Sequence, residues 1–307
     1  MDLLGIGDGL VPEMVPMPGG HSGETFLATS AGERTVVRIY AGRSAARGAN
    51  AAEIDAAVRR LVRGLLPVSE VLEVRRADPS AGTPALLVTT CLPGTRLDEV
   101  LPVADEALAT TIGHNLGLIL ARLAQMPMLH AGLFVDGELR IQPMPPELED
   151  LLSWVETRVD EGPLAEWAEA DLEGLRELAD RAQETLDRTT RACLVHSDFN
   201  PKNILVEPST GEVTGLLDWE YSHAGSPFTD LGNLLRFDRR PDLAGAVLST
   251  YSDNVVDAPE DLLDRARAVD MWALVDLSAR RDESPVAGRA HDRLLAMARS
   301  GDLHATA

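Results

Sequence analysis

Three side chains in one short stretch have the types and the spacing of a metal site with a base beside it. Asp198 is predicted on a loop, Asn203 follows five residues later just before a strand-like run, and Asp218 ends the next such run. A hairpin of this length can bring the three side chains to one point. Amide and carboxylate oxygens suit Mg²⁺, which takes few protein ligands and completes its shell with water and phosphate. Asp198 is then left to accept a proton from a hydroxyl group.

The first part of the chain, which must position part of this site, has the pattern of a small β-rich lobe. Strands are predicted at 22–29, 35–40, 68–76 and 84–90. A helix is predicted at 47–63, and its inward face carries Ile54, Val58, Leu61 and Val62. The lobe should therefore hold one helix against its strands.

From Pro93 onward the pattern is mainly helical. Long amphipathic helices are predicted at 103–126, 147–160, 171–189, 259–280 and 286–299. A β-rich island at 192–218, which contains the three side chains, interrupts them. We therefore expect an α+β protein of two lobes, a β-rich one at residues 1–92 and a larger helical one at residues 93–307.

The stretch His196–Asn203, HSDFNPKN, resembles the His-x-Asp-x-x-x-x-Asn catalytic loop of the aminoglycoside phosphotransferase and choline kinase family. Asp218-Trp219-Glu220 resembles that family's substitute for the Asp-Phe-Gly of protein kinases, and residues 222–236 resemble its usual continuation. The resemblance implies a protein-kinase-like fold and transfer of phosphate from ATP or GTP. It implies Asp198 as the catalytic base, with Asn203 and Asp218 holding Mg²⁺ on the nucleotide.

The resemblance also implies a set of nucleotide contacts in the first lobe. Gly20 and Ser22 lie in a glycine-rich turn that could cover phosphates, although such a turn is also common in plain hairpins. The family's strand lysine is replaced by Arg38, which we expect to pair with Glu53 on the predicted helix and to contact phosphate. The alternative is a strand arginine at the surface.

The link between the lobes resembles a nucleotide-binding hinge. Main-chain groups from Thr90 to Leu92 would then bind the adenine edge, although the same apolar run could be the core of an edge strand. His196 is expected to order the catalytic loop, and Asp230 to cap a helix or tie down that loop. Neither is assigned a role in proton transfer.

Charge is the main sequence evidence on the acceptor. The chain carries 28 Lys and Arg against 49 Asp and Glu, a net charge of −21, which disfavours nucleic acid as a partner. Lys202 is the only lysine. The first residues lack a signal peptide, and we expect a cytoplasmic protein with no membrane partner, either monomer or homodimer.

The acidic balance favours a small cationic acceptor. The carboxylates that we assign to its binding are Glu156, Asp160, Glu220 and Asp261, each of which could equally belong to a solvated surface. Acceptors modified in the family include aminoglycosides and viomycin- or capreomycin-type peptides, and one stretch of the chain looks most similar to the phosphotransferases of those peptides. A kinase of a choline-like, amino-alcohol or sugar metabolite is the alternative, and a binding protein without turnover is a third.

Overall fold

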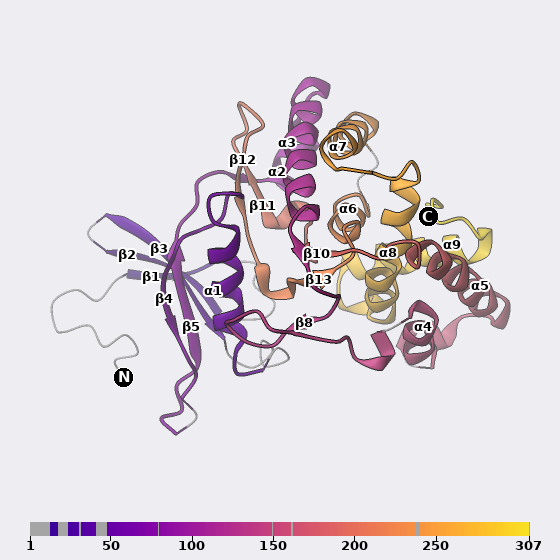
Figure 1. Ribbon diagram of the computed structural model, residues 1–307, viewed down its shortest axis with the longest axis horizontal. Coiled ribbons are helices and arrows are strands. Elements are labelled where there is room, and N and C mark those ends of the chain that lie inside the picture. The colour runs from indigo at the N-terminus through magenta and orange to yellow at the C-terminus, as the bar shows by residue number, and fades with distance from the viewer. Residues whose placement is uncertain are drawn as a thin grey trace. The chain divides into compact units, whose positions relative to one another are not determined.

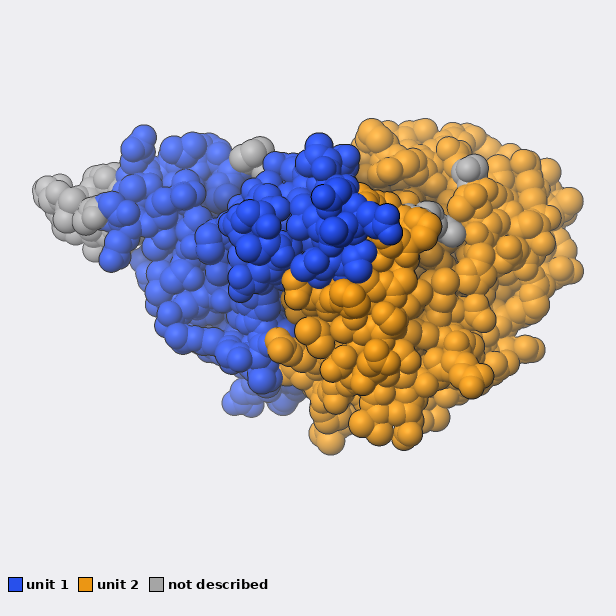
Figure 2. All heavy atoms as spheres, turned by 90° about the horizontal axis from the view of Figure 1, so that it is seen from above, with its two compact units in different colours: residues 1–112, 134–142, 200–222 blue, residues 113–133, 143–199, 223–307 orange. Residues whose placement is uncertain are grey.

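The computed structural model describes residues 13–17, 24–30, 32–40, 48–78, 80–148, 150–160, 162–237 and 240–306 (Figure 1). The chain divides into two compact units (Figure 2). Unit 1 comprises residues 1–112, 134–142 and 200–222, and unit 2 comprises residues 113–133, 143–199 and 223–307. The chain thus passes between the units repeatedly and not once at residue 92. A separate domain at residues 1–92 stays a prediction.

Unit 1 contains a five-stranded antiparallel sheet with the strand order β1-β2-β3-β5-β4. Its strands are β1 (Glu13–Pro16), β2 (Glu24–Ser30), β3 (Glu33–Tyr40), β4 (Val71–Arg75) and β5 (Ala85–Thr90). The four strands expected from the alternating pattern are β2 to β5, and β1 was not expected. Strand β5 lies between β3 and β4 and is buried at all but two positions.

Helix α1 (Ala51–Val62) packs against this sheet (Figure 1). Ile54, Val58 and Val62 are buried as predicted, but the prediction for Leu61 is wrong, because 42% of it is exposed. The buried face of α1 is centred on Asp55 and Arg59 and not on the apolar stripe. Leu61 therefore falls just beyond its edge.

The rest of unit 1 is a short three-stranded sheet with the order β12-β11-β6. Its strands are β6 (Thr95–Arg96), β11 (Ile204–Val206) and β12 (Val213–Leu216). Short helices flank them, namely α2 (Leu97–Val100), η2 (Leu101–Val103), η5 (Pro201–Asn203) and η6 (Trp219–Tyr221). Strands β8 (Leu133–Phe134) and β9 (Ile141–Gln142) form a separate pair. The β-rich segment predicted at residues 192–218 is confirmed, and β11 and β12 form a hairpin within it.

Unit 2 is mainly helical around a small sheet with the order β13-β10-β7. The strands are β7 (Pro127–Met128), β10 (Ala192–Val195) and β13 (His223–Gly225). The helices are α3 (Glu106–Ala124, which starts in unit 1), α4 (Leu151–Val159), α5 (Glu169–Leu186), α6 (Thr229–Leu234), α7 (Pro241–Asn254), α8 (Leu262–Ala279) and α9 (Pro285–Ser300). Three short 3₁₀ helices join them, η3 (Pro146–Leu148), η4 (Gly162–Glu166) and η7 (Arg281–Glu283).

A single apolar core joins α4, α5, α8 and α9. On α5 the buried residues Leu175, Leu178, Ala179 and Ala182 recur at intervals of three and four, as an amphipathic helix requires. Leu274 of α8 and Leu294 of α9 are fully buried in the same cluster. These four helices and α3 match the five helices that the sequence pattern predicts.

Helices α3 and α7 approach each other closely through two glycines. A Cβ on Gly113 would lie 2.7 Å from the carbonyl oxygen of Leu243, and one on Gly117 would lie 2.7 Å from Cβ of Thr250. His114 also contacts Thr250, with Nδ1 2.6 Å from Oγ1. By length and composition α3 could cross a membrane, but 56% of its most apolar window is buried within the structure, as is common for a core helix.

Candidate active site

The β11–β12 hairpin brings Asn203 and Asp218 to the same end of two neighbouring strands. Ile204 pairs with Leu216, and one step beyond this pair the N–H of Leu217 donates to the carbonyl oxygen of Asn203 at 2.8 Å. Asn203 precedes β11 and Asp218 follows β12. As the spacing predicts, an amide and a carboxylate thus lie at the open end of one hairpin in unit 1, next to this hydrogen bond.

Asp218 has an unusual backbone conformation. Its φ of 60° and ψ of 62° lie in the left-handed region, which costs free energy for a residue with a side chain. The residues after it hold the turn, because the fully buried Trp219 donates from Nε1 to the carbonyl oxygen of Leu216 at 3.2 Å. Ser222 donates from Oγ to the carbonyl oxygen of Trp219 at 2.6 Å. Strain of this kind is concentrated at functional sites.

Arg38 of β3 binds two carboxylates, and neither is the one that we expected. Its Nη1 lies 2.5 Å from Oδ1 of Asp218, and its Nη2 lies 2.7 Å from Oε2 of Glu220. Glu53 instead pairs with Arg76 at 2.7 Å. The predicted Arg38–Glu53 pair is therefore wrong. Because the buried face of α1 is centred near Asp55, two residues and about 200° further round the helix, Glu53 lies on the opposite side.

The buried acid of α1 is Asp55, which sequence reasoning did not single out. Its carboxylate is fully buried and accepts from Tyr40 Oη at 2.6 Å and from Arg59 Nε at 2.8 Å. Arg59 also donates from Nη1 to Ser69 Oγ at 2.9 Å. Burial alone would raise the pKa of Asp55, but Arg59, Arg38 and the hydrogen bonds lower it overall. The sequence did contain a signal for this buried pair, because Asp55 and Arg59 lie four residues apart on the apolar face of the predicted helix.

Arg38 is mostly buried and remains a cation. Burial lowers its pKa, but the negative charges of Asp218, Asp55 and Glu220 outweigh burial and raise the pKa well above its ordinary value. Burial and the negative charge of Asp55 raise the pKa of Tyr40 well above 10, although Arg38 and Arg59 act in the opposite direction. The phenol is therefore neutral and can donate to Asp55. Glu220 is 7% exposed, so a role in binding the acceptor would require its ion pair with Arg38 to open.

The predicted hinge residues are partly engaged within unit 1. Thr90 closes β5, and its N–H donates to the carbonyl oxygen of Glu70 at 3.0 Å. Its hydroxyl accepts from the N–H of Glu70 at 2.9 Å. The N–H of Thr90 is therefore not available to an adenine edge. Leu92 packs toward Gly215 of β12, and the predicted phosphate-loop residues Gly20 and Ser22 lie outside the described residues.

In unit 2, Asp230 at the start of α6 holds the loop that leads to Asp198. Its two carboxylate oxygens accept from the N–H groups of His196 at 2.8 Å and Ser197 at 2.7 Å. Asn233 donates from Nδ2 to the carbonyl oxygen of Ser197 at 3.1 Å, and Ser197 has a φ of 66°. The prediction that Asp230 ties down this loop is confirmed. Burial raises the pKa of Asp230, and the two N–H donors and His196 only partly offset it.

His196 also has the structural place that we expected. It is 1% exposed, its ring packs edge-on against Phe199 with centroids 5.9 Å apart, and Nδ1 accepts from the N–H of Asp198 at 3.3 Å. The ring therefore fixes the backbone beside Asp198. The chain enters unit 1 between Phe199 and Asn200.

The predicted acceptor-binding carboxylates of unit 2 are mostly occupied by arginines. Glu156 pairs with Arg176 at 2.7 Å. Asp261 pairs with Arg265 at 2.7 Å and lies 3.6 Å from Arg188. Asp160 is exposed at the end of α4 and has no ion-pair partner among the residues that the structure describes. These charges are therefore less available to a cation than the sequence alone indicates.

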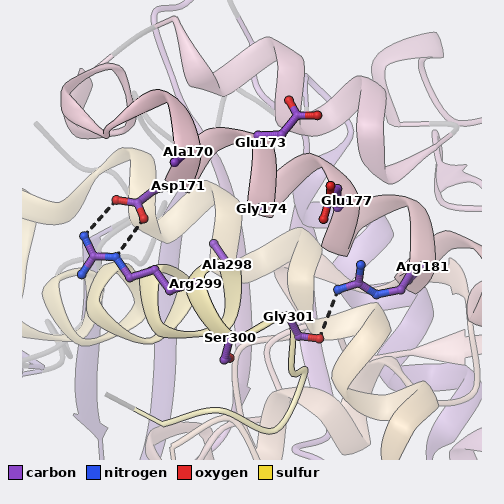
Figure 3. Close-up of a pocket in the computed structure, with 10 residues that line it drawn as sticks. All are labelled: Ala170, Asp171, Glu173, Gly174, Glu177, Arg181, Ala298, Arg299, Ser300 and Gly301. Carbon is purple, nitrogen blue, oxygen red and sulfur yellow. Dashed lines mark hydrogen bonds and ion pairs between the residues drawn. The ribbon is translucent and has the colours of Figure 1, made fainter.

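A surface depression between α5 and α9 is the pocket drawn in Figure 3. It is lined by helix-surface residues that include Asp171, Glu173, Gly174, Arg181, Arg299 and Gly301. Asp171 and Arg299 form two hydrogen bonds of 2.8 Å across it, and Arg181 donates to the carbonyl oxygen of Gly301 at 3.1 Å. None of the predicted site residues lines this depression.

The donor set at the hairpin end fits Mg²⁺. Asn203 and Asp218 offer one amide and one carboxylate oxygen source, and Mg²⁺ commonly takes one or two protein ligands with phosphate and water for the rest. Within the described residues no group of three or more His, Cys, Asp or Glu side chains could hold a metal alone. The fit is thus to a nucleotide-bound cation and not to an all-protein cage.

Comparison with known families supports the same chemistry. A family model described as the phosphotransferase enzyme family matches residues 13–269, which is most of the chain. The chain belongs to the phosphotransferase enzyme family. All three residues of the candidate site, Asp198, Asn203 and Asp218, lie within the matched part of this phosphotransferase.

Solved structures similar to this phosphotransferase include aminoglycoside phosphotransferases. The GDP complex of wild-type aminoglycoside 2'-phosphotransferase-IIIa has a TM-score of 0.70 with 15% identity, over 98% of this chain and 97% of that chain. A thermostable mutant of aminoglycoside phosphotransferase APH(4)-Ia with ADP and hygromycin B has a TM-score of 0.68 with 17% identity, over 94% of each chain. At such identities the likeness concerns the fold, and the predicted α+β, protein-kinase-like fold is confirmed.

Curated relatives of this phosphotransferase are much longer proteins. Acyl-CoA dehydrogenase family member 10 of Mus musculus is 25% identical over 220 residues, which is 71% of this chain and 20% of that protein. Acyl-CoA dehydrogenase family member 11 of the same species is 45% identical over 51 residues, 17% of this chain and 6% of that protein. The phosphotransferase therefore spans a fifth or less of the curated relatives that it matches.

Proposed function

We propose that this phosphotransferase transfers the γ-phosphate of ATP or GTP to a hydroxyl group of a small molecule. One observation carries the proposal: Asn203 and Asp218 lie together at the open end of the β11–β12 hairpin, where the N–H of Leu217 donates to the carbonyl oxygen of Asn203. An amide and a carboxylate so placed are the oxygen donors expected for Mg²⁺ on nucleotide phosphates. Membership of the family supports this assignment.

In the proposed reaction, each residue of the chain has a separate task. Asp198 accepts the proton of the acceptor hydroxyl, and the bonds from Asp230 and His196 keep the backbone of its loop in one conformation. Arg38 supplies a fixed positive charge for phosphate. Mg²⁺, when held by Asn203 and Asp218, would neutralise charge on the transferred group. Positioning and electrostatics would thus supply most of the rate.

For the acceptor, we propose a small cationic antibiotic, whose phosphorylation would confer resistance. The net charge of −21 favours a cation, and Asp160 is an exposed carboxylate on α4. Two similar solved structures are of aminoglycoside phosphotransferases, one of them bound to hygromycin B. An aminoglycoside or a viomycin- or capreomycin-type peptide has the required hydroxyl and amino groups.

One observation favours a second candidate, a kinase of a small metabolite. Glu156 and Asp261, two of the acids proposed to attract a cation, are each bound by arginine. At Asp261 two arginines face a single carboxylate and leave no net negative charge. At Glu156 the pairing arginine is shared with Glu169 and Glu173, so part of the negative charge remains there. A choline-like compound, an amino alcohol or a sugar needs fewer carboxylates than a polycation does.

A nucleoside-diphosphate release assay tests both candidates. The purified chain with Mg²⁺ and ATP or GTP would be offered aminoglycosides, viomycin, capreomycin, choline, amino alcohols and sugars, with Asp198→Asn as the matched inactive variant. A cationic antibiotic acceptor should give diphosphate release, and its KM should rise as salt passes about 0.1 M, where charges more than roughly 10 Å apart are screened.

The outcomes separate the candidates. Release only with a neutral or zwitterionic metabolite, without a rise in antibiotic resistance when a susceptible host expresses the chain, would replace the antibiotic by the metabolite. No release with any acceptor and no binding of nucleotide would reject phosphoryl transfer altogether.

A further inference from the structure

We propose that Tyr40 and Asp55 are positioning residues that hold Arg38 for the nucleotide, a task that the sequence pattern assigns to Glu53. The inference rests on the proposed function, because it takes Arg38 as the residue that contacts phosphate. It concerns residues of unit 1 only.

Arg38 and Tyr40 are two residues apart on β3, so their side chains leave the same face of the strand. The guanidinium carbon of Arg38 lies 5.3 Å from the centre of the Tyr40 ring. A cation within about 6 Å of an aromatic ring face is attracted by it. Tyr40 therefore provides a surface against which the guanidinium lies.

Asp55 fixes the tyrosine ring from the helix side. The Tyr40 hydroxyl donates to Oδ2 of Asp55 at 2.6 Å, and Arg59 donates to the other oxygen at 2.8 Å. Because both oxygens are bound and the residue is fully buried, Asp55 cannot move without breaking these bonds. The chain of contacts thus runs from α1 through Tyr40 to Arg38.

The charges of this cluster also help to hold Arg38 in place. Two cations, Arg38 and Arg59, face three carboxylates, Asp55, Asp218 and Glu220. Among the neighbouring charges that raise the pKa of Arg38, Asp55 is second only to Asp218. When Asp218 is engaged by a cation, Arg38 still keeps Glu220 and the field of Asp55. Asp55 and Tyr40 then retain the guanidinium beside the hairpin end.

Glu53 cannot perform this task in the observed fold. It lies about 200° round α1 from Asp55, and its carboxylate binds Arg76, whose side chain is 80% exposed. Mutation of Asp55 should therefore weaken nucleotide binding through Arg38, whereas mutation of Glu53 should not.

The test compares single and double variants by calorimetry of ATP binding in the presence of Mg²⁺. Tyr40→Phe removes only the hydroxyl and should weaken binding about threefold to tenfold, and Asp55→Asn should weaken it about tenfold or more. Neither change should add further weakening in a chain that already carries Arg38→Ala, since both act through Arg38. Tyr251→Phe, which removes a buried hydroxyl bound to the carbonyl oxygen of Pro227 in unit 2, is the matched control and should leave affinity within twofold.

Several results would overturn the inference. Wild-type affinity in Tyr40→Phe would do so, as would Glu53→Gln weakening binding more than Asp55→Asn. Equal losses with and without Arg38→Ala would show that Asp55 acts on the fold and not through Arg38. If Asp55→Asn fails to fold, Tyr40→Phe alone decides the matter.

A second readout keeps this result separate from the proposed function. The Tyr40→Phe and Arg38→Ala cycle can be repeated by denaturant unfolding without nucleotide, where the two changes should be non-additive. If the unmodified chain bound no nucleotide, the proposed function would fall, and this cycle would still decide whether Tyr40 holds Arg38. Additive unfolding effects would reject the contact itself.

Discussion

Arg38 and Asp218 are 180 residues apart in sequence, and their side chains form an ion pair of 2.5 Å that is partly buried. Asp218 is also the only carboxylate that we propose as a ligand of Mg²⁺. The carboxylate of Asp218 can therefore bind either of two cations, Arg38 or Mg²⁺. A cation bound at Asp218 would compete with Arg38 for this carboxylate. The terminal nitrogen that binds Asp218 would then be available to phosphate, while the other nitrogen keeps Glu220.

We expect Asp218→Asn to abolish the Mg²⁺-dependent part of nucleotide binding, because an amide replaces the one charged ligand. Calorimetry with and without Mg²⁺ measures this part directly. Asp78→Asn, in an exposed turn of the same unit, is the matched control. Unchanged affinity for the Mg²⁺ complex of ATP in Asp218→Asn would remove Asp218 from the metal site.

For Asp198, we expect Asn or Ala to lower turnover by about a thousandfold or more, since the proposed base acts on the acceptor. Nucleotide affinity should stay within a few fold, which also shows that the variant folds. Steady-state kinetics and calorimetry on the same preparation give both quantities. Turnover close to that of the unmodified chain would end the proposed mechanism.

Arg38→Lys should preserve only part of the nucleotide affinity. The two terminal nitrogens of Arg38 each bind a different carboxylate, and a single ammonium group cannot reproduce this fork. We expect a loss of about tenfold for Arg38→Lys and a larger loss for Arg38→Ala. Arg34→Lys, on the exposed part of the same strand, controls for the change of residue type. Equal affinities of Arg38→Lys and the unmodified chain would show that the fork is not needed.

Sequence reasoning succeeded where the information was local. The spacing of Asn203 and Asp218 predicted the β11–β12 hairpin, because strand pairing over a short connection depends on neighbouring residues. The meeting of Asp198 with these two side chains stays a prediction. The expected pair of Arg38 with Glu53 failed because a two-residue error on a helix moves a side chain to the opposite face. To predict the role of Asp55, one would have needed to know how α1 is oriented against the sheet, and this orientation depends on residues distant in the sequence.

Helix α7 shows a different limit. Its sequence, PDLAGAVLSTYSDN, contains Gly, Ser, Thr and Asn, which favour helices weakly, and no helix was expected there. The helix forms because Leu243, Ala246 and Val247 are buried and because Gly113 and Gly117 let α3 approach. Tertiary packing here outweighs local preference.

The α3–α7 contact makes a sharp prediction about stability. Gly113→Ala should lower the free energy of unfolding by about 1–3 kcal/mol, because the new Cβ would meet the Leu243 carbonyl at 2.7 Å. Gly245→Ala on α7 faces open space and should instead raise it by about 0.5–1 kcal/mol. Denaturant unfolding of both variants measures the difference. Equal effects of the two changes would mean that the helices separate easily.

Stability should also depend on the protonation of His291. Burial lowers its pKa below the ordinary 6.5, Arg281 lowers it further, and Ser278, Asp282 and Asp292 only partly compensate. The ring accepts at Nε2 from Trp167 at 3.1 Å, which a protonated ring cannot do.

A depressed pKa in the folded state contributes stability above pH 6.5 that is lost as the pH falls through the folded pKa. The free energy of unfolding should therefore decrease below about pH 6.5, and His291→Gln should show a smaller decrease. Denaturant titrations of both chains across this range provide the comparison. Parallel pH profiles would exclude His291 as the cause.

Lys202 is exposed on η5, one residue before Asn203, and its backbone N–H donates to the side chain of Asn200 at 3.0 Å. Since it is the only lysine of the chain, it carries the only ε-amine that an acylating reagent can modify. A fluorophore attached there would sit beside the proposed metal ligands at a single defined position. Because no other ε-amine competes, a fluorophore on Lys202 could report the binding of nucleotide without an introduced residue, once the α-amino group is blocked.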